Sequence, residues 1–255
     1  MKTDVLLKDL AAVFRWTARL NMHEGIANHF SIKLDQEDNN NNNNNSFYIN
    51  RPGQHFSKMK ASDLLLVNES DIDMLRDRPD IIDPTAVNIH GTIHSKVKDA
   101  NCILHCHSKY ATILSTFADM TLPPIDQNTM RYFNRITYYD DFDGMGFMEE
   151  SEKMAASMNN SKRGGKTNNV MLMANHGVIT IGKNIAEAFD HLYYFEKSCE
   201  TYITALQTRQ PLNVVSDAVA EKTALDWENY PTDSDQLHLN AIRSILDMED
   251  ETYKS

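Results

Sequence analysis

Residues 99–112 read DANCILHCHSKYAT, a sequence in which a short apolar run leads directly into His105, Cys106 and His107. This composition is typical of a buried strand, in which successive side chains point to opposite faces. His105 and His107 are therefore expected on one face of the strand and Cys106 on the other. Two imidazoles on one face, two residues apart, can share a metal ion.

A third histidine, His176, is followed by glycine and lies between apolar runs at residues 170–174 and 178–181. Both runs predict strands, and the glycine permits the backbone to approach a bound group closely. A catalytic zinc site takes three protein ligands and leaves a fourth position open. The pattern thus predicts zinc, or another divalent metal, on His105, His107 and His176. For the His-x-His pair alone, ordinary polar residues at a strand end are the commoner explanation.

Helical and strand-like patterns are mixed along the rest of the chain. Apolar residues recur at helical spacing over residues 6–20 and again over residues 185–207, which predicts an amphipathic helix at each place. Shorter patterns predict further strands at residues 29–33, 47–50, 64–67 and 136–139, and further helices at residues 85–98, 108–117 and 149–158. Strands mixed with helices on a central sheet indicate the α/β class.

The 255 residues are expected to form one domain with two unusual segments. The domain is expected to span residues 1–210, with a disordered asparagine-rich loop at residues 35–46 that expands a hairpin tip. We assign this loop no catalytic role. The more polar residues 211–255 are expected to form a C-terminal helical extension packed on the same domain.

Composition excludes several classes of function. The chain carries 25 lysines and arginines against 36 acidic residues, a formal net charge of −11, without a basic patch for nucleic acid or an anionic membrane. No window has the run of about 18 apolar residues needed to span a bilayer, and no signal peptide is visible. The three cysteines show no CxxC spacing, which favours a reducing compartment and predicts a cytoplasmic protein.

The histidine motifs and their surroundings resemble the class II aldolase/adducin family. The likeness is carried by residues 99–112, the sequence Leu122-Pro123-Pro124-Ile125, the sequence Asn175-His176-Gly177 and the long helix beginning at Ala186. It extends from the first helix to about residue 206. The resemblance implies a three-layer α/β/α sandwich, a small-molecule substrate and a homo-oligomer, by family habit a tetramer with active sites between subunits.

The resemblance also implies a chemistry, with one departure. Sugar-phosphate aldolases of this family bind zinc through the three matching histidines and use a carboxylate from the preceding helix as acid and base. The metal polarises a carbonyl group while a carbon–carbon bond breaks. By spacing from His105, the carboxylate position falls at Ala86, which can neither bind metal nor transfer a proton.

Other family positions are partly retained. The phosphate-binding segments match Ala27-Asn28, Pro52-Gly53 and Pro84-Thr85, which makes Asn28, Gly53 and Thr85 candidate substrate-binding residues. His90 lies one helical turn beyond Ala86, so it is the candidate replacement for the missing proton carrier. A helix-face histidine satisfied by hydrogen bonds is the alternative explanation for His90.

Two functions from different classes follow. The first is a metal-dependent aldolase-like lyase acting on a small hydroxy or oxo compound. The second is a noncatalytic adducin-like binding module of a cytoskeletal assembly. The complete histidine triad and the absence of a basic tail favour the enzyme, while Ala86 argues against a standard aldolase.

Overall fold

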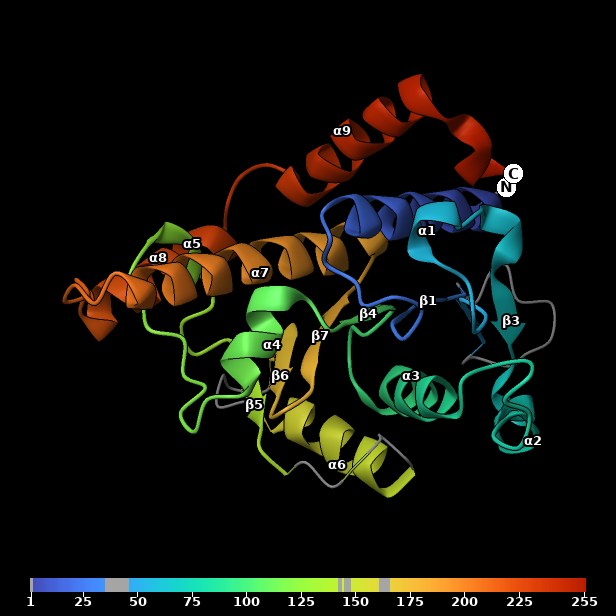
Figure 1. Ribbon diagram of the computed structural model, residues 1–255, viewed down its shortest axis with the longest axis horizontal. Coiled ribbons are helices and arrows are strands. Elements are labelled where there is room, and N and C mark those ends of the chain that lie inside the picture. Colours follow the sequence, from blue (N-terminus) through green and yellow to red (C-terminus); the bar gives the residue numbers. More distant parts are fainter. Residues whose placement is uncertain (1, 35–45, 142–143, 145–147, 161–165) are drawn as a thin grey trace.

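The computed structural model describes residues 2–34, 46–141, 144, 148–160 and 166–255 (Figure 1). The asparagine tract at residues 39–45, and all but Ser46 of the predicted disordered loop, lie outside the described residues. The disorder of this loop therefore stays a prediction.

The helices lie close to their predicted positions. The first helix, α1, covers Lys2–Arg19 and begins earlier than the apolar pattern indicated, because Asp4 and Lys8 extend it as an i,i+4 ion pair of 2.7 Å. The longest, α7, covers Ile185–Gln207 as predicted. The others are α2 (Ile72–Leu75), α3 (Pro84–Lys96), α4 (Lys109–Ser115), α5 (Gln127–Arg131), α6 (Met148–Asn159), α8 (Asp217–Glu228) and α9 (Ser234–Glu249). Short 3-10 turns are η2 (Phe56–Lys58), η3 (Ala61–Asp63), η4 (Glu69–Asp71) and η5 (Glu251–Lys254).

The described strands form one seven-stranded sheet in the order β3-β2-β1-β4-β7-β6-β5. They are β1 (His29–Lys33), β2 (Phe47–Ile49), β3 (Leu65–Val67), β4 (Cys102–Cys106), β5 (Ile136–Tyr139), β6 (Val170–Met173) and β7 (Gly177–Gly182). Every neighbouring pair is antiparallel except β5 and β6, which run parallel. The strand β4 lies at the centre of this order, so the stretch that carries His105 forms the middle of the sheet.

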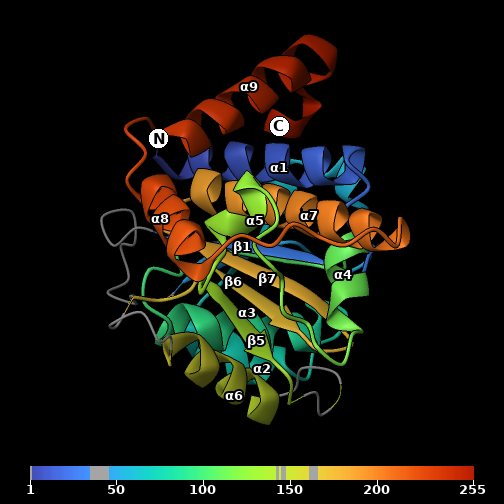
Figure 2. The same ribbon diagram turned by 90° about the vertical axis from the view of Figure 1, so that its left-hand side faces the viewer.

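Helices cover both faces of the sheet. Figure 2 shows α1 and α7 on one face, α3 and α6 on the other, and α9 lying outside α1. The expected three-layer α/β/α architecture is therefore confirmed. In the described part of the chain, no helix is both long enough and apolar enough to cross a membrane.

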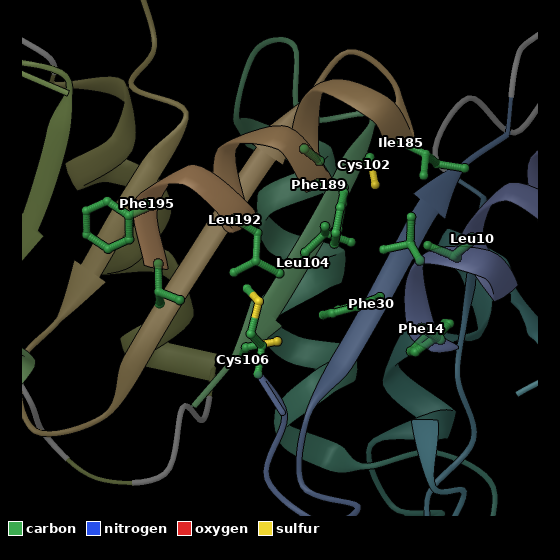
Figure 3. Packing of buried hydrophobic residues seen from close by; sticks show 14 of the residues in the cluster. Leu10, Phe14, Phe30, Cys102, Leu104, Cys106, Ile185, Phe189, Leu192 and Phe195 are labelled. Atoms are coloured by element: carbon green, nitrogen blue, oxygen red, sulfur yellow. The ribbon is translucent and has the colours of Figure 1, made fainter. Parts of the chain in front are cut away.

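Alternation along β4 divides its side chains between the two faces as expected. Cys102, Leu104 and Cys106 are buried in the larger apolar cluster, against α1 and α7 (Figure 3). Ile103 instead joins the smaller cluster on the α3 and α6 face. His105 follows the same alternation and faces the α3 side, which leaves Cys106 as a core residue.

The cap of α3 fixes where this helix begins. Asp83 is the N-cap residue, and its Oδ1 accepts hydrogen bonds from the backbone N–H groups of Thr85 and Ala86, at 2.8 and 3.3 Å. Pro84 occupies the first turn, where its missing N–H costs nothing. This start places His90 and His94, one turn apart, on the helix face that packs against β1.

Candidate metal centre

Three histidine side chains converge at the end of β4. One nitrogen from each of His105, His107 and His176 lies within 4.8 Å of the other two. The His105 and His107 Nε2 atoms are 3.1 Å apart, and the His176 ring centroid is 4.9 Å from each of the other two centroids. The structure thus brings together all three residues that the sequence predicted as metal ligands.

The turn between β6 and β7 positions His176. Cys106 of β4 pairs with Val178 of β7, so the turn lies against the end of β4. Asn175 has a φ of 55°, a left-handed conformation that asparagine tolerates better than most residues. A Cβ atom on Gly177 would lie 2.6 Å from the Cys106 carbonyl oxygen, which no ordinary contact allows. Glycine is therefore required there to seat His176 beside the other two imidazoles.

Outer hydrogen bonds fix the protons of two of these rings. The Nδ1 of His105 donates to the carbonyl oxygen of Val178 at 3.1 Å, and that of His107 donates to Glu24 Oε2 at 2.6 Å. Both partners are acceptors only, so in the neutral rings each Nε2 carries a lone pair. Two lone pairs facing each other at 3.1 Å repel unless a cation lies between them. The donor set therefore fits a divalent metal such as zinc.

Burial favours the neutral form of His105 and His176, which metal ligation needs. Desolvation lowers the pKa of His105 well below its usual value, and the neighbouring histidines lower it further. Desolvation, with a smaller effect of His107, lowers the pKa of His176 to about 4. Near neutral pH both rings therefore offer lone pairs without first losing a proton.

A fourth histidine, His29, lies beside the triad. It is the register partner of His105 on the adjacent strand β1, and their ring centroids are 4.7 Å apart. Its Nδ1 lies 2.7 Å from His90 Nε2, while His90 Nδ1 lies 2.5 Å from Ser31 Oγ. Ser31 Oγ in turn lies 2.7 Å from His94 Nε2. A hydrogen-bonded row of side chains thus crosses the interface of β1 and α3.

His90 does not reach the metal triad directly. It is completely buried, and both of its ring nitrogens are engaged, one by His29 and one by Ser31. This is the hydrogen-bonded helix-face environment that the sequence left open as the alternative. If His90 carries a proton, it therefore does so through His29.

The candidate substrate residues occupy different places. Asn28 is buried just before β1, and its Oδ1 accepts a 2.6 Å hydrogen bond from the backbone N–H of Glu24. Glu24 is the residue that binds His107, so Asn28 is connected to the centre through it. Its Nδ2 is a buried donor without a partner among the described residues. Thr85 turns its hydroxyl to Asp83 Oδ1 at 2.6 Å. Gly53 lies in an exposed turn with a φ of 79°. The hydrogen bonds of the described residues link only Asn28 to the centre.

The carboxylate position of the family resemblance is apolar in this chain. Ala86 is almost completely buried in a cluster that includes Phe47, Ile49 and Val67. The nearest acidic residue is Asp83, the N-cap of the same helix. Burial lowers the pKa of His29 to about 3, and the negative charge of Asp83 partly opposes this lowering. The pKa of Asp83 is itself lowered, with desolvation opposed by its Thr85 hydrogen bond and by His29.

Sequence reasoning missed His29 and Ser31. A usable signal was present, because residues 29 and 31 of one predicted strand share a face, as do residues 90 and 94 of one predicted helix. Nothing in the sequence alone shows that these two faces meet. That fact depends on the pairing of β1 with β4 and on the packing of α3 beneath them.

Comparison with known proteins relates most of this chain to one family. Residues 8–203 match the family described as Class II Aldolase and Adducin N-terminal domain. The Meiotically up-regulated gene 14 protein of Schizosaccharomyces pombe is 30% identical over 199 residues, covering 76% of this chain and 70% of that protein. Human beta-adducin is 28% identical over 163 residues, which cover 64% of this chain and 21% of beta-adducin.

A solved structure extends the likeness to the whole fold. The aldolase II superfamily protein from Pseudomonas syringae superposes with a TM-score of 0.83 at 26% identity, covering 99% of this chain and 96% of that one. The matched residues 8–203 include β4 and the β6–β7 turn, and hence the three convergent histidines. The chain therefore belongs to the class II aldolase and adducin N-terminal domain family.

Proposed function

We propose that this protein is a metal-dependent, aldolase-like lyase that acts on a small hydroxy or oxo compound. His105, His107 and His176 would hold zinc or another divalent metal. The supporting observation is the pair of Nε2 atoms 3.1 Å apart, both turned to the same point by outer hydrogen bonds. A protein that only docks a partner has no need of such a cluster of nitrogen ligands.

The side chains around the centre have separable roles in this proposal. A bound divalent metal supplies Lewis-acid polarisation of a carbonyl oxygen. Glu24 orients the His107 ring and makes it a better donor to a cation. Asn28 offers a buried amide donor, and Gly53 and Thr85 remain proposed substrate-binding residues. Proton transfer is assigned to His90 acting through His29, because no carboxylate stands at Ala86.

This assignment predicts which reactions are slow. Family aldolases that cleave sugar phosphates use the carboxylate that Ala86 replaces. Loss of one well-placed acid/base group costs about a hundredfold to ten-thousandfold in rate. Cleavage of ordinary sugar phosphates should therefore be weak, and a substrate suited to an imidazole proton carrier should react faster.

The test is a paired assay of the native protein and the variant His90→Gln. Both are loaded with zinc and offered a panel of hydroxy-aldehydes, hydroxy-ketones and their phosphates. We expect turnover of at least one compound by the native protein, and loss of that turnover in His90→Gln at unchanged metal content. Full activity of His90→Gln would contradict the proton role, and inertness toward the panel despite bound metal would contradict the lyase.

The second candidate function is a noncatalytic adducin-like module of a cytoskeletal assembly. The match to beta-adducin over 163 residues favours it. Such a module needs no metal, so a metal-free preparation that captures a cytoskeletal protein would support it over the lyase. A homo-oligomer, a tetramer by family habit, is part of our main proposal and is tested by light scattering of the purified protein. The cytoplasmic location stays a prediction.

A further inference from the structure

A buried row of hydrogen bonds runs from a backbone carbonyl to the edge of the metal centre. His94 Nδ1 lies 2.7 Å from the Ala100 carbonyl oxygen, and His94 Nε2 lies 2.7 Å from Ser31 Oγ. Ser31 Oγ lies 2.5 Å from His90 Nδ1, and His90 Nε2 lies 2.7 Å from His29 Nδ1. None of the four side chains is more than 5% exposed, so water does not replace these bonds.

The direction of each bond in the first half of this row follows from counting protons. A carbonyl oxygen only accepts, so the Nδ1 of His94 carries a hydrogen and donates to Ala100. A neutral imidazole has one N–H, which makes His94 Nε2 an acceptor for the Ser31 hydroxyl. Ser31 has no second hydrogen to give. Its oxygen therefore accepts from the Nδ1 of His90.

The same count of hydrogens gives the direction of the remaining bond, between His90 and His29. Because His90 Nδ1 carries the hydrogen, its Nε2 accepts, and His29 Nδ1 must be the donor. The Nε2 of His29 then holds a lone pair. All three rings are buried, which disfavours their charged forms and leaves each with one N–H.

The free Nε2 of His29 lies next to the ligand set without belonging to it. It has no hydrogen-bond partner among the described residues. It is also not among the polar atoms that are both fully buried and without a partner. The His29 and His105 rings are register partners with centroids 4.7 Å apart. His29 is nevertheless absent from the group of nitrogens that lie within 4.8 Å of one another. The His29 ring therefore lies beside the ligand set, in contact with His105, without being part of it.

We propose that His29 is a specificity-determining residue whose Nε2, fixed as an acceptor by the row from Ala100, receives a hydrogen bond from a hydroxyl of the bound compound. The selected class is a compound that carries a hydroxyl beside its metal-binding oxygen, as α-hydroxy acids and α-hydroxy ketones do. An ionised carboxylate or an ether has no hydrogen to donate at this position. The inference rests on the proposed function, which supplies the metal that anchors the compound.

The proton positions are tested by nitrogen NMR of the full chain labelled at histidine with ¹⁵N. Zinc-loaded and metal-free protein should both show His29, His90 and His94 as neutral rings protonated at Nδ1. Single substitutions of each histidine assign the signals. In Ser31→Ala, His94 should keep its Nδ1 proton because its carbonyl partner remains, while His90 should lose its fixed form. Protonation of His29 at Nε2, or a signal averaged over two forms, would overturn the proposal.

The substrate preference is tested with glycolate and methoxyacetate, which differ by a methyl group on the hydroxyl oxygen. Binding of each to cobalt-loaded protein is followed by the visible spectrum of the metal. The native protein should bind glycolate about tenfold more tightly, the size of one hydrogen bond. In His29→Ala the ratio should fall close to one while one metal equivalent is retained. An unchanged ratio in His29→Ala would sink the proposal, since the preference would then come from the metal alone.

The two failures remain distinguishable. If the protein binds no metal, the proposed function fails, yet the NMR experiment on metal-free protein still reports the three tautomers. If metal binds and the panel is turned over, but His29 carries its proton at Nε2, only the specificity assignment fails. Ser31→Ala connects the two experiments, because it changes no residue at the metal and should still reduce the preference for glycolate.

Discussion

Glu24 is an exposed side chain that contacts one histidine of the triad. Its carboxylate accepts a 2.6 Å hydrogen bond from His107 Nδ1 while its own side chain is 66% exposed. The bond orients the His107 ring and leaves Nε2 as the only available ligand atom. Because β4 and the β6–β7 turn seat His105 and His176, we expect Glu24 to act on the proposed metal site and not on the fold.

We therefore expect Glu24→Ala to weaken zinc affinity by about tenfold to a hundredfold, the usual cost of losing an outer partner of a histidine ligand. The affinity is measured by competition with a chelating indicator, and thermal unfolding of the metal-free variant should match the native protein. Glu152→Ala is the matched control, because Glu152 is also a surface carboxylate but pairs with Lys96, on the helices α6 and α3. Equal affinities for both variants would refute the orienting role.

Gly177 is a second residue whose substitution tests how the triad is positioned. A Cβ atom at this position would meet the Cys106 backbone oxygen at 2.6 Å and the His107 Cα at 3.3 Å, so the turn must move away from β4. Gly177→Ala should cost about 1 to 3 kcal/mol in the free energy of unfolding, as overpacking does, and should weaken metal binding by displacing His176.

Gly91→Ala is the control for this substitution. Its added Cβ would meet only the end of the flexible Ile72 side chain, at 2.9 Å, and alanine favours the helix α3. Urea unfolding should therefore find Gly91→Ala close to the native protein. If Gly177→Ala retains both its stability and its zinc, the turn does not need glycine to seat His176.

At the scale of elements, the interface of β1 and α3 is unusual because it is built from histidines and a serine instead of aliphatic side chains. His90 and His94 of α3 meet His29 and Ser31 of β1. All donors and acceptors within this row are satisfied except the outer nitrogen of His29. Burial disfavours the charged form of each ring, so a proton taken up by this network costs stability.

This interface predicts an acid-sensitive fold. The folded pKa of His94 is lowered to about 3 from 6.5, so between these values the unfolded chain binds the extra proton and the native state does not. The free energy of unfolding therefore falls on acidification by about 1.4 kcal/mol per pH unit for each such histidine. Urea unfolding of metal-free protein should show the loss beginning as the pH drops below about 6.5.

His94→Gln separates this effect from general acid unfolding. Glutamine keeps a donor and an acceptor but takes up no proton, so the variant should lose stability less steeply between pH 6.5 and 5. An equal slope in both proteins would mean that His94 does not contribute to the acid sensitivity.

Local patterns predicted most elements because each depends on residues close in sequence. The helical repeat over residues 185–207 corresponds to α7, and the apolar run before His105 corresponds to β4. The shared face of His105 and His107 also follows from strand geometry alone. The neighbours of His105 do not, because β1 and β7 pair with it from about 75 residues away on either side.

The role suggested for His90 shows where local reasoning ends. Helical spacing placed it one turn beyond Ala86, and that placement is correct. Spacing could not show that His29 of β1 contacts both His90 and His105, and so stands between His90 and the triad. Helical spacing is the same for a side chain that touches the histidine triad and for one that reaches it only through another residue.

At the scale of the whole molecule, the sheet should tolerate loss of the asparagine tract. The backbone N–H of Leu34 donates to the Ser46 carbonyl at 2.9 Å, and Lys33 pairs with Phe47, so β1 and β2 are joined up to the edge of the segment. Deleting residues 39–45 should therefore change the melting temperature by only about a few degrees. A large fall in melting temperature by calorimetry would show that the tract contributes to the fold.

The C-terminal helices complete the molecule in a way that no periodic pattern indicated. The helix α9 packs on α7 and α1, and α8 packs on α5. Arg15 of α1 connects this region to the sheet side, since it donates to Asp250 and Thr252 beyond α9 and to the Met59 carbonyl. Through these contacts α8 and α9 lie against helices that precede residue 210, and the domain boundary at that residue stays a prediction.

The metal content of the purified protein decides whether the three histidines form a metal site. Protein purified without added metal is analysed for zinc, manganese and cobalt, before and after dialysis against each ion. The convergent nitrogens of His105, His107 and His176 predict about one equivalent per chain, lost on acidification because protons compete for the imidazoles. Less than about a tenth of an equivalent, with no uptake of any of the three ions, would contradict the account.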